Sequence, residues 1–497
     1  LYYEAASGQV TALNGSGRAP IGLTLARLQR EGLGEALPPY HPYTITVPGA
    51  CAGWCDLLER HGRLPISQVL APAIRLAEEG YPVAPVTAYF WKRSEERLRA
   101  APNGVELTIE GRAPRPGELF HNPGLARSLR LIAEGGKAAY YQGPIAEALA
   151  AVVQSAGGCL SAADLAAHTS TWDMPISVPY RGLRVWECPP NGQGLAALLA
   201  LNILQGFDLA ELPPLSARRL HVLIEAMRLA FADTRWYVAD PATNPAPLAQ
   251  LLSEEYAAER RKRIDPHRAT LNQRLGTPTT SSDTVYLCTV DAEGNACSFI
   301  NSNYMGFGTG IVPRGWGFTL QNRGHNFSLD PHHPNALAPG KRPYHTIIPG
   351  MITADSSQLS ASSDPLSPEK PPAISHPPSA IRHTLYAPFG VMGGFMQPQG
   401  HMQVVVGLAD DGLVPQAALD RPRFCIDDGT AGGVVSLEQG LPDETIAGLA
   451  DMDHPVKLVQ GYARALFGRG QIIHRDLATG VLCGGSDPRA DGCAMGV

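Results

Sequence analysis

The sequence predicts a globular protein of mixed α/β (α+β) class. Amphipathic helical patterns dominate the first half of the chain, and strand-like alternation replaces them after residue 284. No apolar run approaches the roughly 18 residues that a membrane-spanning helix needs. A chain of 497 residues can bury a large core, and its net charge of −6 argues against a general nucleic-acid or anionic-membrane binder.

The helical patterns follow a 3.6-residue period and end at turn-forming residues. They cover residues 47–62, 67–83, 160–168, 193–209 and 217–238. In the third, Ser161 is a candidate N-cap and Asp164 completes a capping box with Asp in place of Glu. In the last, apolar side chains form one stripe, which predicts core packing rather than a cofactor site: Leu223, Ala226, Met227, Ala230 and Phe231.

Strand patterns occupy much of the second half. TVYLCTV (284–290) and ACSFINSN (296–303) flank the turn-rich DAEGN, and further strands are expected at 316–322, 401–410 and 470–487. The Ser- and Pro-rich stretch 354–379 is too polar to pack and is expected to be a disordered insertion between two strands.

The opening run LYYEAASGQV has the pattern of a β-hairpin, so we expect the chain to lack its N-terminal part. The nine cysteines are odd in number and scattered, which predicts no disulfide framework and favours a reducing, cytoplasmic compartment. Cys51 and Cys55 lie one helical turn apart, and core packing explains them better than metal or redox chemistry.

The hairpin after residue 283 brings two hydroxyl groups together. Centring the turn on Glu293 places Thr284 directly opposite Ser302, with Cβ atoms about 4.5–5.5 Å apart. A nucleophilic hydroxyl needs a base, and a threonine at a chain terminus carries its own, an α-amine with a pKa near 7.7–8.0. On the hairpin alone, two ordinary strand residues are the simpler interpretation.

A second element is the pair Gly393-Gly394 in FGVMGGFMQPQGH (389–401). Without side chains, its backbone can approach a reacting carbon closely. Two successive N–H groups of this kind can form an oxyanion hole. A Gly-Gly pair is weak evidence by itself, because most such pairs are turns.

A set of ordered motifs carries a resemblance over nearly the whole chain apart from the Ser/Pro stretch. The motifs are SGRAP (16–20), VPGACAGW (47–54), LAPAIRLAEEGYPV (70–83), PPNGQG (189–194), IEAMRLAFAD (224–233), DTVYLCTVDAEGNA (283–296), GFGTGIV (306–312), GKRPYHTIIP (340–349) and GVMGG (390–394). Together they resemble the γ-glutamyltranspeptidase family of N-terminal nucleophile hydrolases. The resemblance implies a four-layer αββα sandwich with two stacked sheets.

The resemblance also implies a precursor that cuts itself between Asp283 and Thr284. The products would be a large subunit, 1–283, and a small subunit, 284–497. In turnover, Thr284 Oγ would attack an amide carbonyl while its amine relays the proton, and Ser302 would hydrogen-bond the nucleophile. The N–H groups of Gly393 and Gly394 would hold the oxyanion. No metal or organic cofactor is expected.

Substrate-binding positions depart from the family pattern. Members that act on γ-glutamyl compounds grip the glutamate head with amide, acidic, hydroxyl and arginine side chains. The corresponding residues here are Tyr304, Arg323 and Asn326 for the α-amino group, Ser16 with Arg18 nearby for the α-carboxylate, and His345-Thr346 for the serine pair. The anionic contacts for an ammonium group are lost and a cation is added, which disfavours a zwitterionic head.

We therefore expect an amidase or acyltransferase for γ-glutamyl or related carboxylate-bearing acyl amides, glutathione-like compounds among them. A cephalosporin- or glutaryl-acylase-like enzyme is the alternative, and Arg323 or Arg18 would bind the carboxylate. The expected partners are a small amide and the two fragments of one precursor, without nucleic acid or membrane. Homo-oligomerisation is left open.

Two interpretations of other classes compete. His325, His332 and His333 cluster around Asp330, which suggests a metal hydrolase. Their spacing matches no established zinc signature, and a solvated loop explains them better. A catalytically inactive structural or binding relative is the other, and the retained hydroxyl and glycine pairs argue against it.

Overall fold

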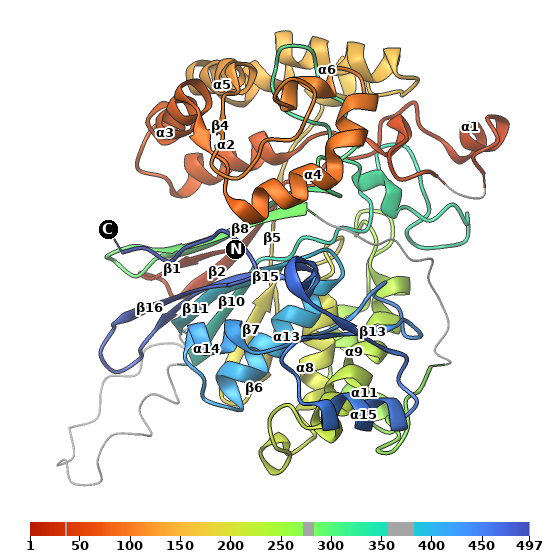
Figure 1. Cartoon of the computed structure of the whole chain (residues 1–497), viewed down its shortest axis with the longest axis vertical. Helices are drawn as coiled ribbons and strands as arrows, with labels where there is room; N and C mark the ends of the chain where they lie inside the picture. The colour runs from red at the N-terminus through yellow and green to blue at the C-terminus, as the bar shows by residue number, and fades with distance from the viewer. Residues whose placement is uncertain (35–36, 272–282, 356–381, 497) are drawn as a thin grey trace, which may run out of the picture.

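Two β-sheets face each other at the centre of the molecule, with helices on both outer sides (Figure 1). The structure is a computed structural model that describes residues 1–34, 37–271, 283–355 and 382–496. The predicted αββα sandwich is confirmed. Among the described residues, no helix is long and apolar enough to cross a bilayer, and all nine cysteines are free.

The first sheet carries the hydroxyl hairpin. Its strand order is β5 (Thr171–Asp173), β2 (Gln9–Asn14), β1 (Tyr2–Glu4), β9 (Ala296–Tyr304) and β8 (Asp283–Val290). Thr284 lies opposite Ser302, and Val290 lies opposite Ala296, which confirms the predicted register. The opening run of the chain forms the antiparallel pair β1–β2, also as predicted.

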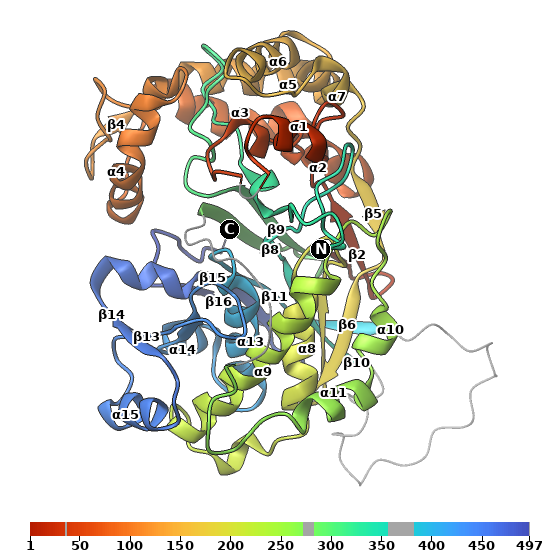
Figure 2. The same cartoon turned by 90° about the vertical axis from the view of Figure 1, so that its right-hand side faces the viewer.

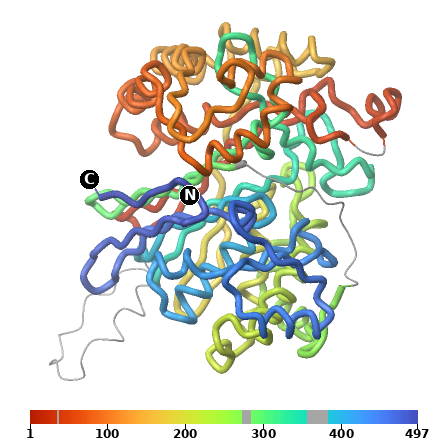
Figure 3. The backbone as a smooth tube through the Cα atoms, in the orientation of Figure 1, coloured from red at the N-terminus to blue at the C-terminus, as the bar shows by residue number. Residues whose placement is uncertain are grey.

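The second sheet lies against the first and leads to the glycine pair. Its order is β16 (Leu482–Ser486), β15 (Arg469–Arg475), β11 (His383–Met392), β10 (Gly350–Asp355), β7 (Leu183–Glu187) and β6 (Ile176–Tyr180). A Cβ atom at Gly390 would lie 2.4 Å from the Tyr286 ring, so glycine lets the sheets meet closely. The early, middle and late parts of the chain thus meet at the centre (Figure 3).

Each outer layer of helices covers one sheet (Figure 2). The layer on the second sheet contains α8 (Gly194–Leu204), α9 (Ala217–Tyr237), α10 (Leu248–Leu251), α11 (Glu254–Arg261), α13 (Met396–Ala409), α14 (Pro415–Asp420) and α15 (Asp443–Asp451). The other layer contains α1 (Leu25–Arg30), α2 (Ala50–His61), α3 (Ile66–Glu79), α4 (Pro85–Ala100), α5 (Pro123–Tyr141), α6 (Pro144–Ser155) and α7 (Ala162–Ala166).

Two small sheets complete the fold. One contains β12 (Phe424–Ile426), β13 (Val435–Glu438) and β14 (Val456–Val459). The other pairs β3 (Tyr81–Pro82) with β4 (Leu119–Phe120).

The five predicted helices are present, and the capping box of Ser161 and Asp164 opens α7 as expected. The strand pattern at 470–487 is confirmed as β15 and β16. The predicted insertion 354–379 begins within β10, and its residues from 356 onward lie outside the described part of the chain.

Two strand predictions are wrong. Residues 401–409 lie in helix α13, and Asp410 is its C-cap. This helix is buried almost all round, so it lacks the polar face that marks a surface helix. Residues 316–322 form no strand. Gly315 and Gly317 have φ of 76° and 71°, and only isolated backbone bonds, such as Leu320 N to Ile311 O at 2.9 Å, hold the segment.

A buried ionic network supports the end of β11. Arg489 pairs with Glu438 at 2.6 Å and with Asp487 at 3.0 Å, and Arg423 pairs with Asp487 at 2.9 Å. Arg423 Nη1 also donates to Phe467 O at 2.9 Å. The next residue, Gly468, lies against Gly393, so this network fixes the backbone behind the glycine pair.

Replacing Arg489 by Met should lower the free energy of unfolding by about 3–5 kcal/mol, because it leaves two buried carboxylates short of a partner. Chemical denaturation would measure the change. Lys262→Met removes an exposed cation paired with Glu259 and should leave the midpoint unchanged. Equal effects of the two substitutions would contradict a supporting role for the network.

Candidate active site

Thr284 is held with its hydroxyl in a defined direction. Its side chain is buried, and its Oγ1 donates to Ser302 Oγ at 3.1 Å. Ser302 Oγ also accepts from the Tyr304 backbone N–H at 2.8 Å, which fixes the acceptor. The hairpin register therefore places one oriented hydroxyl at the start of β8.

The backbone just before Thr284 is irregular. The β8–β9 register shifts between Asp283 and Thr284, and Tyr304, opposite Asp283, has a φ of 75°, which is rare for a residue with a side chain. Register shifts and strained residues concentrate at functional sites. The peptide bond of the predicted cleavage site thus lies at a distortion in an otherwise regular ladder.

Gly393 and Gly394 form the turn between β11 and α13. Their φ values of 141° and 61° favour glycine, and a Cβ atom at Gly393 would lie 3.1 Å from the Met396 side chain. Within the described residues, neither backbone N–H donates a hydrogen bond. Both groups lie at the positive end of the α13 dipole, so they can stabilise a developing oxyanion.

Arg323 is a buried cation. It is 2% exposed, its Nη1 donates to Thr346 Oγ1 at 2.5 Å, and its guanidinium lies 4.7 Å from the centroid of the Tyr304 ring. Burial lowers its pKa to about 9. In the part of the chain that the structure describes, Nη2 has no hydrogen-bond partner and no carboxylate pairs with the group.

Arg323 lines a cavity of about 160 Å³ together with Ser16, Ser302 and His345. Among its described lining residues, Arg323 is the one whose side chain is charged at pH 7. Burial, with Arg323 and Arg342 nearby, lowers the pKa of His345 well below its usual value, so that ring is neutral at pH 7. Thr346 is fully buried and holds the guanidinium. The cavity is therefore suited to an anion.

Arg18 and Asn326, both predicted as substrate contacts, do not line this cavity. Arg18 donates to Asp240 at 3.0 Å and to the Gly340 carbonyl at 3.2 Å, so its charge is already paired. The Asn326 carbonyl accepts from Asn335 at 2.7 Å. Of the two arginines named from the sequence, the structure favours Arg323 as the ligand of an anion.

The sequence reasoning missed Gln193, although it lies in the PPNGQG motif. Its fully buried carboxamide donates to Thr346 O at 2.6 Å and to Gly394 O at 2.8 Å, and it accepts from Tyr344 OH at 3.1 Å. One side chain thus links the Arg323 partner to the glycine turn. A polar residue between glycines just before an apolar helix was the available signal.

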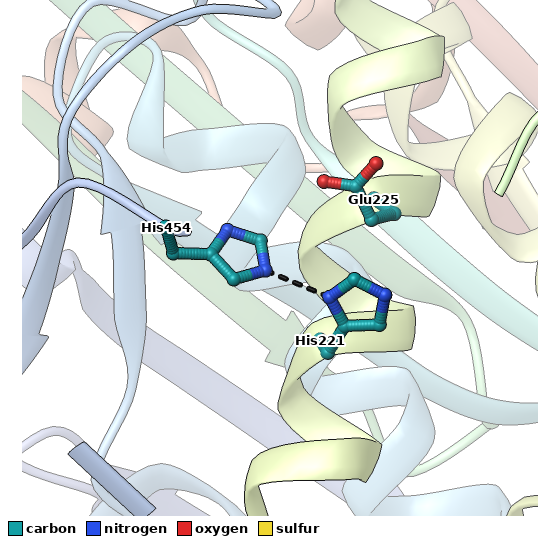
Figure 4. A group of neighbouring side chains, drawn as sticks. All are labelled: His221, Glu225 and His454. Atoms are coloured by element: carbon teal, nitrogen blue, oxygen red, sulfur yellow. Dashed lines mark hydrogen bonds between the residues drawn. The ribbon is translucent and has the colours of Figure 1, made fainter. Parts of the chain in front are cut away.

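A buried group formed by two residues of α9 and one residue after α15 has the composition of a metal site. Ligand atoms of His221, Glu225 and His454 lie within 4.8 Å of one another (Figure 4). His221 Nε2 donates to Asp265 O at 2.7 Å, so its Nδ1 accepts from His454 Nε2 at 2.8 Å. Glu225 accepts from the Thr270 N–H at 3.1 Å. These bonds engage both ring nitrogens of His221, and they tie residues 265–270 to α9.

The side chains of the histidine cluster predicted from the sequence form hydrogen bonds with the backbone of nearby loops. His325 Nδ1 bonds Leu37 O at 2.9 Å, His333 Nδ1 accepts from Asn335 N at 3.0 Å, and Asp330 accepts from His332 N at 2.9 Å. Among the described residues, these side chains do not converge as a ligand set.

Comparison with known proteins gives consistent matches. The family model described as Gamma-glutamyltranspeptidase matches residues 1–363 and 356–497. The crystal structure of cephalosporin acylase from Bacillus halodurans has a TM-score of 0.86 and 46% identity, covering 98% of this chain and 84% of that one.

Two curated relatives are proenzymes. The Glutathione hydrolase-like YwrD proenzyme of Bacillus subtilis is 34% identical, covering 100% of this chain and 89% of the relative. The Oxamate amidohydrolase proenzyme of Klebsiella pneumoniae is 32% identical, covering 98% and 87%.

Replacing Gln193 by Glu should lower the free energy of unfolding by about 2–5 kcal/mol, because two buried carbonyls lose their donor and face a carboxyl group. Denaturant titration would measure it. Gln68→Glu makes the same chemical change at an exposed position on α3 and should leave the midpoint nearly unchanged. A tolerated Gln193→Glu substitution would contradict the linking role.

Proposed function

This chain belongs to the gamma-glutamyltranspeptidase family, and from that premise we propose that Thr284 is the nucleophile of an amidase for carboxylate-bearing acyl groups. The chain is a hydrolytic enzyme of that family, whose relatives are made as proenzymes. The observation that carries the residue assignment is the oriented Thr284 hydroxyl beside a distorted peptide bond.

This geometry supports self-cleavage at the Asp283-Thr284 bond. Thr284 Oγ attacks the carbonyl carbon of Asp283, and its proton passes to the departing nitrogen. The peptide C–N bond breaks and an ester joins Asp283 to Thr284 Oγ, freeing the Thr284 α-amine. Water hydrolyses the ester, which gives a large subunit ending at Asp283 and a small subunit beginning at Thr284.

In turnover, the free α-amine accepts the proton of Thr284 Oγ as the oxygen attacks the substrate amide. The Gly393 and Gly394 N–H groups receive the carbonyl oxygen as its charge develops. The amine leaves after taking the proton, and water or another amine releases the acyl group from its ester. Ser302 keeps the nucleophile directed throughout.

The acyl group is selected by charge. A carboxylate entering the cavity would meet the buried Arg323, whereas the ammonium of a γ-glutamyl head would find a cation and no acid among the described lining residues. Oxamate, named for one relative, is itself an amide that carries a carboxylate. This favours glutaryl-like acyl groups over γ-glutamyl groups.

Thr284→Ala should abolish both self-cleavage and amide hydrolysis, because it removes the proposed nucleophile. A denaturing gel would show one band instead of two, and the smaller wild-type band should begin TVYLC. Thr289→Ala, at an exposed position of the same strand, should cleave normally. Cleavage in the Thr284→Ala variant would refute the assignment.

Arg323→Gln should lower kcat/KM for glutaryl-p-nitroanilide about 30-fold or more, because the carboxylate loses a buried charged partner. Hydrolysis of pentanoyl-p-nitroanilide should change far less. Arg18→Gln should leave the preference for the charged acyl group unaltered, since Arg18 is paired with Asp240. Faster turnover of γ-glutamyl- than of glutaryl-p-nitroanilide by the wild type would contradict the charge argument.

The same interaction should depend on pH. Because the pKa of Arg323 is about 9, the guanidinium is charged below that pH and loses its charge above it. KM for glutaryl-p-nitroanilide should therefore rise as pH increases through 9, while KM for the pentanoyl substrate should not follow. Parallel pH profiles for the two substrates would show that Arg323 does not titrate against the carboxylate.

A further inference from the structure

His401 of α13 reaches back across the glycine turn to the strand that leads into it. Strand β10 pairs with β11 as far as Phe389, so the backbone N–H of Val391 lies beyond that pairing. This N–H donates to His401 Nε2 at 3.1 Å, and both residues are buried. The imidazole thus supplies the acceptor that a neighbouring strand would otherwise provide, and it joins the two ends of the turn.

A glycine lets α13 come this close to β11. A Cβ atom at Gly400 would lie 2.5 Å from Val391 Cγ1. The centroid of the Phe389 ring lies 4.7 Å from that of the imidazole. A larger residue at position 400 would push the helix away from the strand, and His401 would then lie too far from the Val391 N–H to accept its bond. The dipeptide Gly400-His401 therefore fits the helix to the strand.

Glu187, the last residue of β7, sets the proton position on the ring. His401 Nδ1 donates to Glu187 Oε1 at 2.6 Å, and neither side chain is exposed. Because a neutral imidazole carries one N–H, a donor at Nδ1 leaves Nε2 free to accept from Val391. Burial raises the pKa of Glu187, and either form of its carboxyl presents an oxygen that accepts this bond.

The turn that His401 spans contains the two glycines of the proposed oxyanion site. These glycines have no side chains that could hold them in place, so their position depends on their neighbours. Gln193 bonds the Gly394 carbonyl at 2.8 Å, and His401 fixes the strand before the turn. Oxyanion donors act at about 2.7–3.1 Å, and a displacement of about 1 Å can lower a rate about 100-fold.

We propose that His401 and Glu187 are positioning residues of the oxyanion turn, and that they act through the Val391 backbone and not on the substrate. The inference rests on the function proposed above, because it takes the glycine N–H groups as the oxyanion donors. Neither side chain lines the cavities that contain the proposed nucleophile and Arg323. Loss of the pair should therefore lower kcat and leave KM nearly unaltered.

Two substitutions of His401 separate its two hydrogen bonds. His401→Gln places an amide oxygen near the position of Nε2, where it can accept from Val391. His401→Asn is one bond shorter, so it can reach Glu187 but not Val391. With glutaryl-p-nitroanilide, and with kcat expressed per cleaved enzyme, we expect His401→Gln to stay within about threefold of the wild type. His401→Asn should lower kcat at least about 20-fold, with KM within about threefold.

Substitutions of Glu187 test the proton position. Glu187→Gln keeps an oxygen for the Nδ1–H group and should keep kcat within about threefold of the wild type. Glu187→Leu removes that acceptor and should lower kcat as His401→Asn does. The inhibition constant of glutarate reports binding without chemistry, and it should stay within about twofold of the wild-type value in every variant.

His221→Gln is the matched control. His221 is equally buried and also bonds a backbone group, Asp265 O at 2.7 Å. Its partners Asp265 and His454 belong neither to β11 nor to the glycine turn. This substitution should lower the midpoint of chemical unfolding and leave kcat within about twofold of the wild type.

Three results would overturn the inference: His401→Asn keeps the wild-type kcat, His401→Gln loses as much kcat as His401→Asn, or His221→Gln loses as much as either. The second would show that the bond to Val391 is not the relevant one, and the third that lost stability explains the effect. Failure of the proposed function looks different, because the wild type would then not hydrolyse glutaryl-p-nitroanilide, or the Thr284→Ala variant would hydrolyse it.

Discussion

The antiparallel register of β8 and β9 is the constraint on which the site depends. Side chains alternate between the faces of a strand, so a slip of one residue would turn Thr284 away from Ser302 and toward the opposite face. The tight connection between the strands and the pairing of β9 with β1 both oppose such a slip. The regular geometry of the whole hairpin thus places the Thr284 hydroxyl within hydrogen-bond distance of Ser302.

The second constraint is the contact between the sheets. Gly390 lets β11 approach Tyr286, and the turn that β11 leads into presents Gly393 and Gly394. His401 holds this strand from behind: its Nε2 accepts from Val391 N at 3.1 Å, so its Nδ1 donates to the buried Glu187 at 2.6 Å. Two successive glycines suggest a flexible turn. This turn is held in place, because the side chains that contact β11 on either side are buried.

The sequence pattern correctly predicted the features that depend on neighbouring residues in the chain. The register of Thr284 and Ser302, the Ser161 cap and the stripe on α9 follow from alternation, capping and a 3.6-residue period. Residues 401–410 were misassigned because total burial of α13 removes the polar face that reveals a helix. The roles of Gln193 and the pairing of Arg18 depend on partners distant in the chain, and no local pattern encodes those contacts.

The proposed selectivity for the acyl group depends on which arginine side chains the protein does not pair with its own carboxylates. The partly exposed Arg18 and the buried Arg489 both lie beside carboxylates and are neutralised within the fold. Arg323 is buried against a hydroxyl and a ring, neither of which carries a full negative charge at pH 7. Keeping such a group desolvated is unfavourable, and a bound carboxylate relieves that penalty. The unfavourable burial of Arg323 is the physical argument for the proposal that an anion occupies the cavity during turnover.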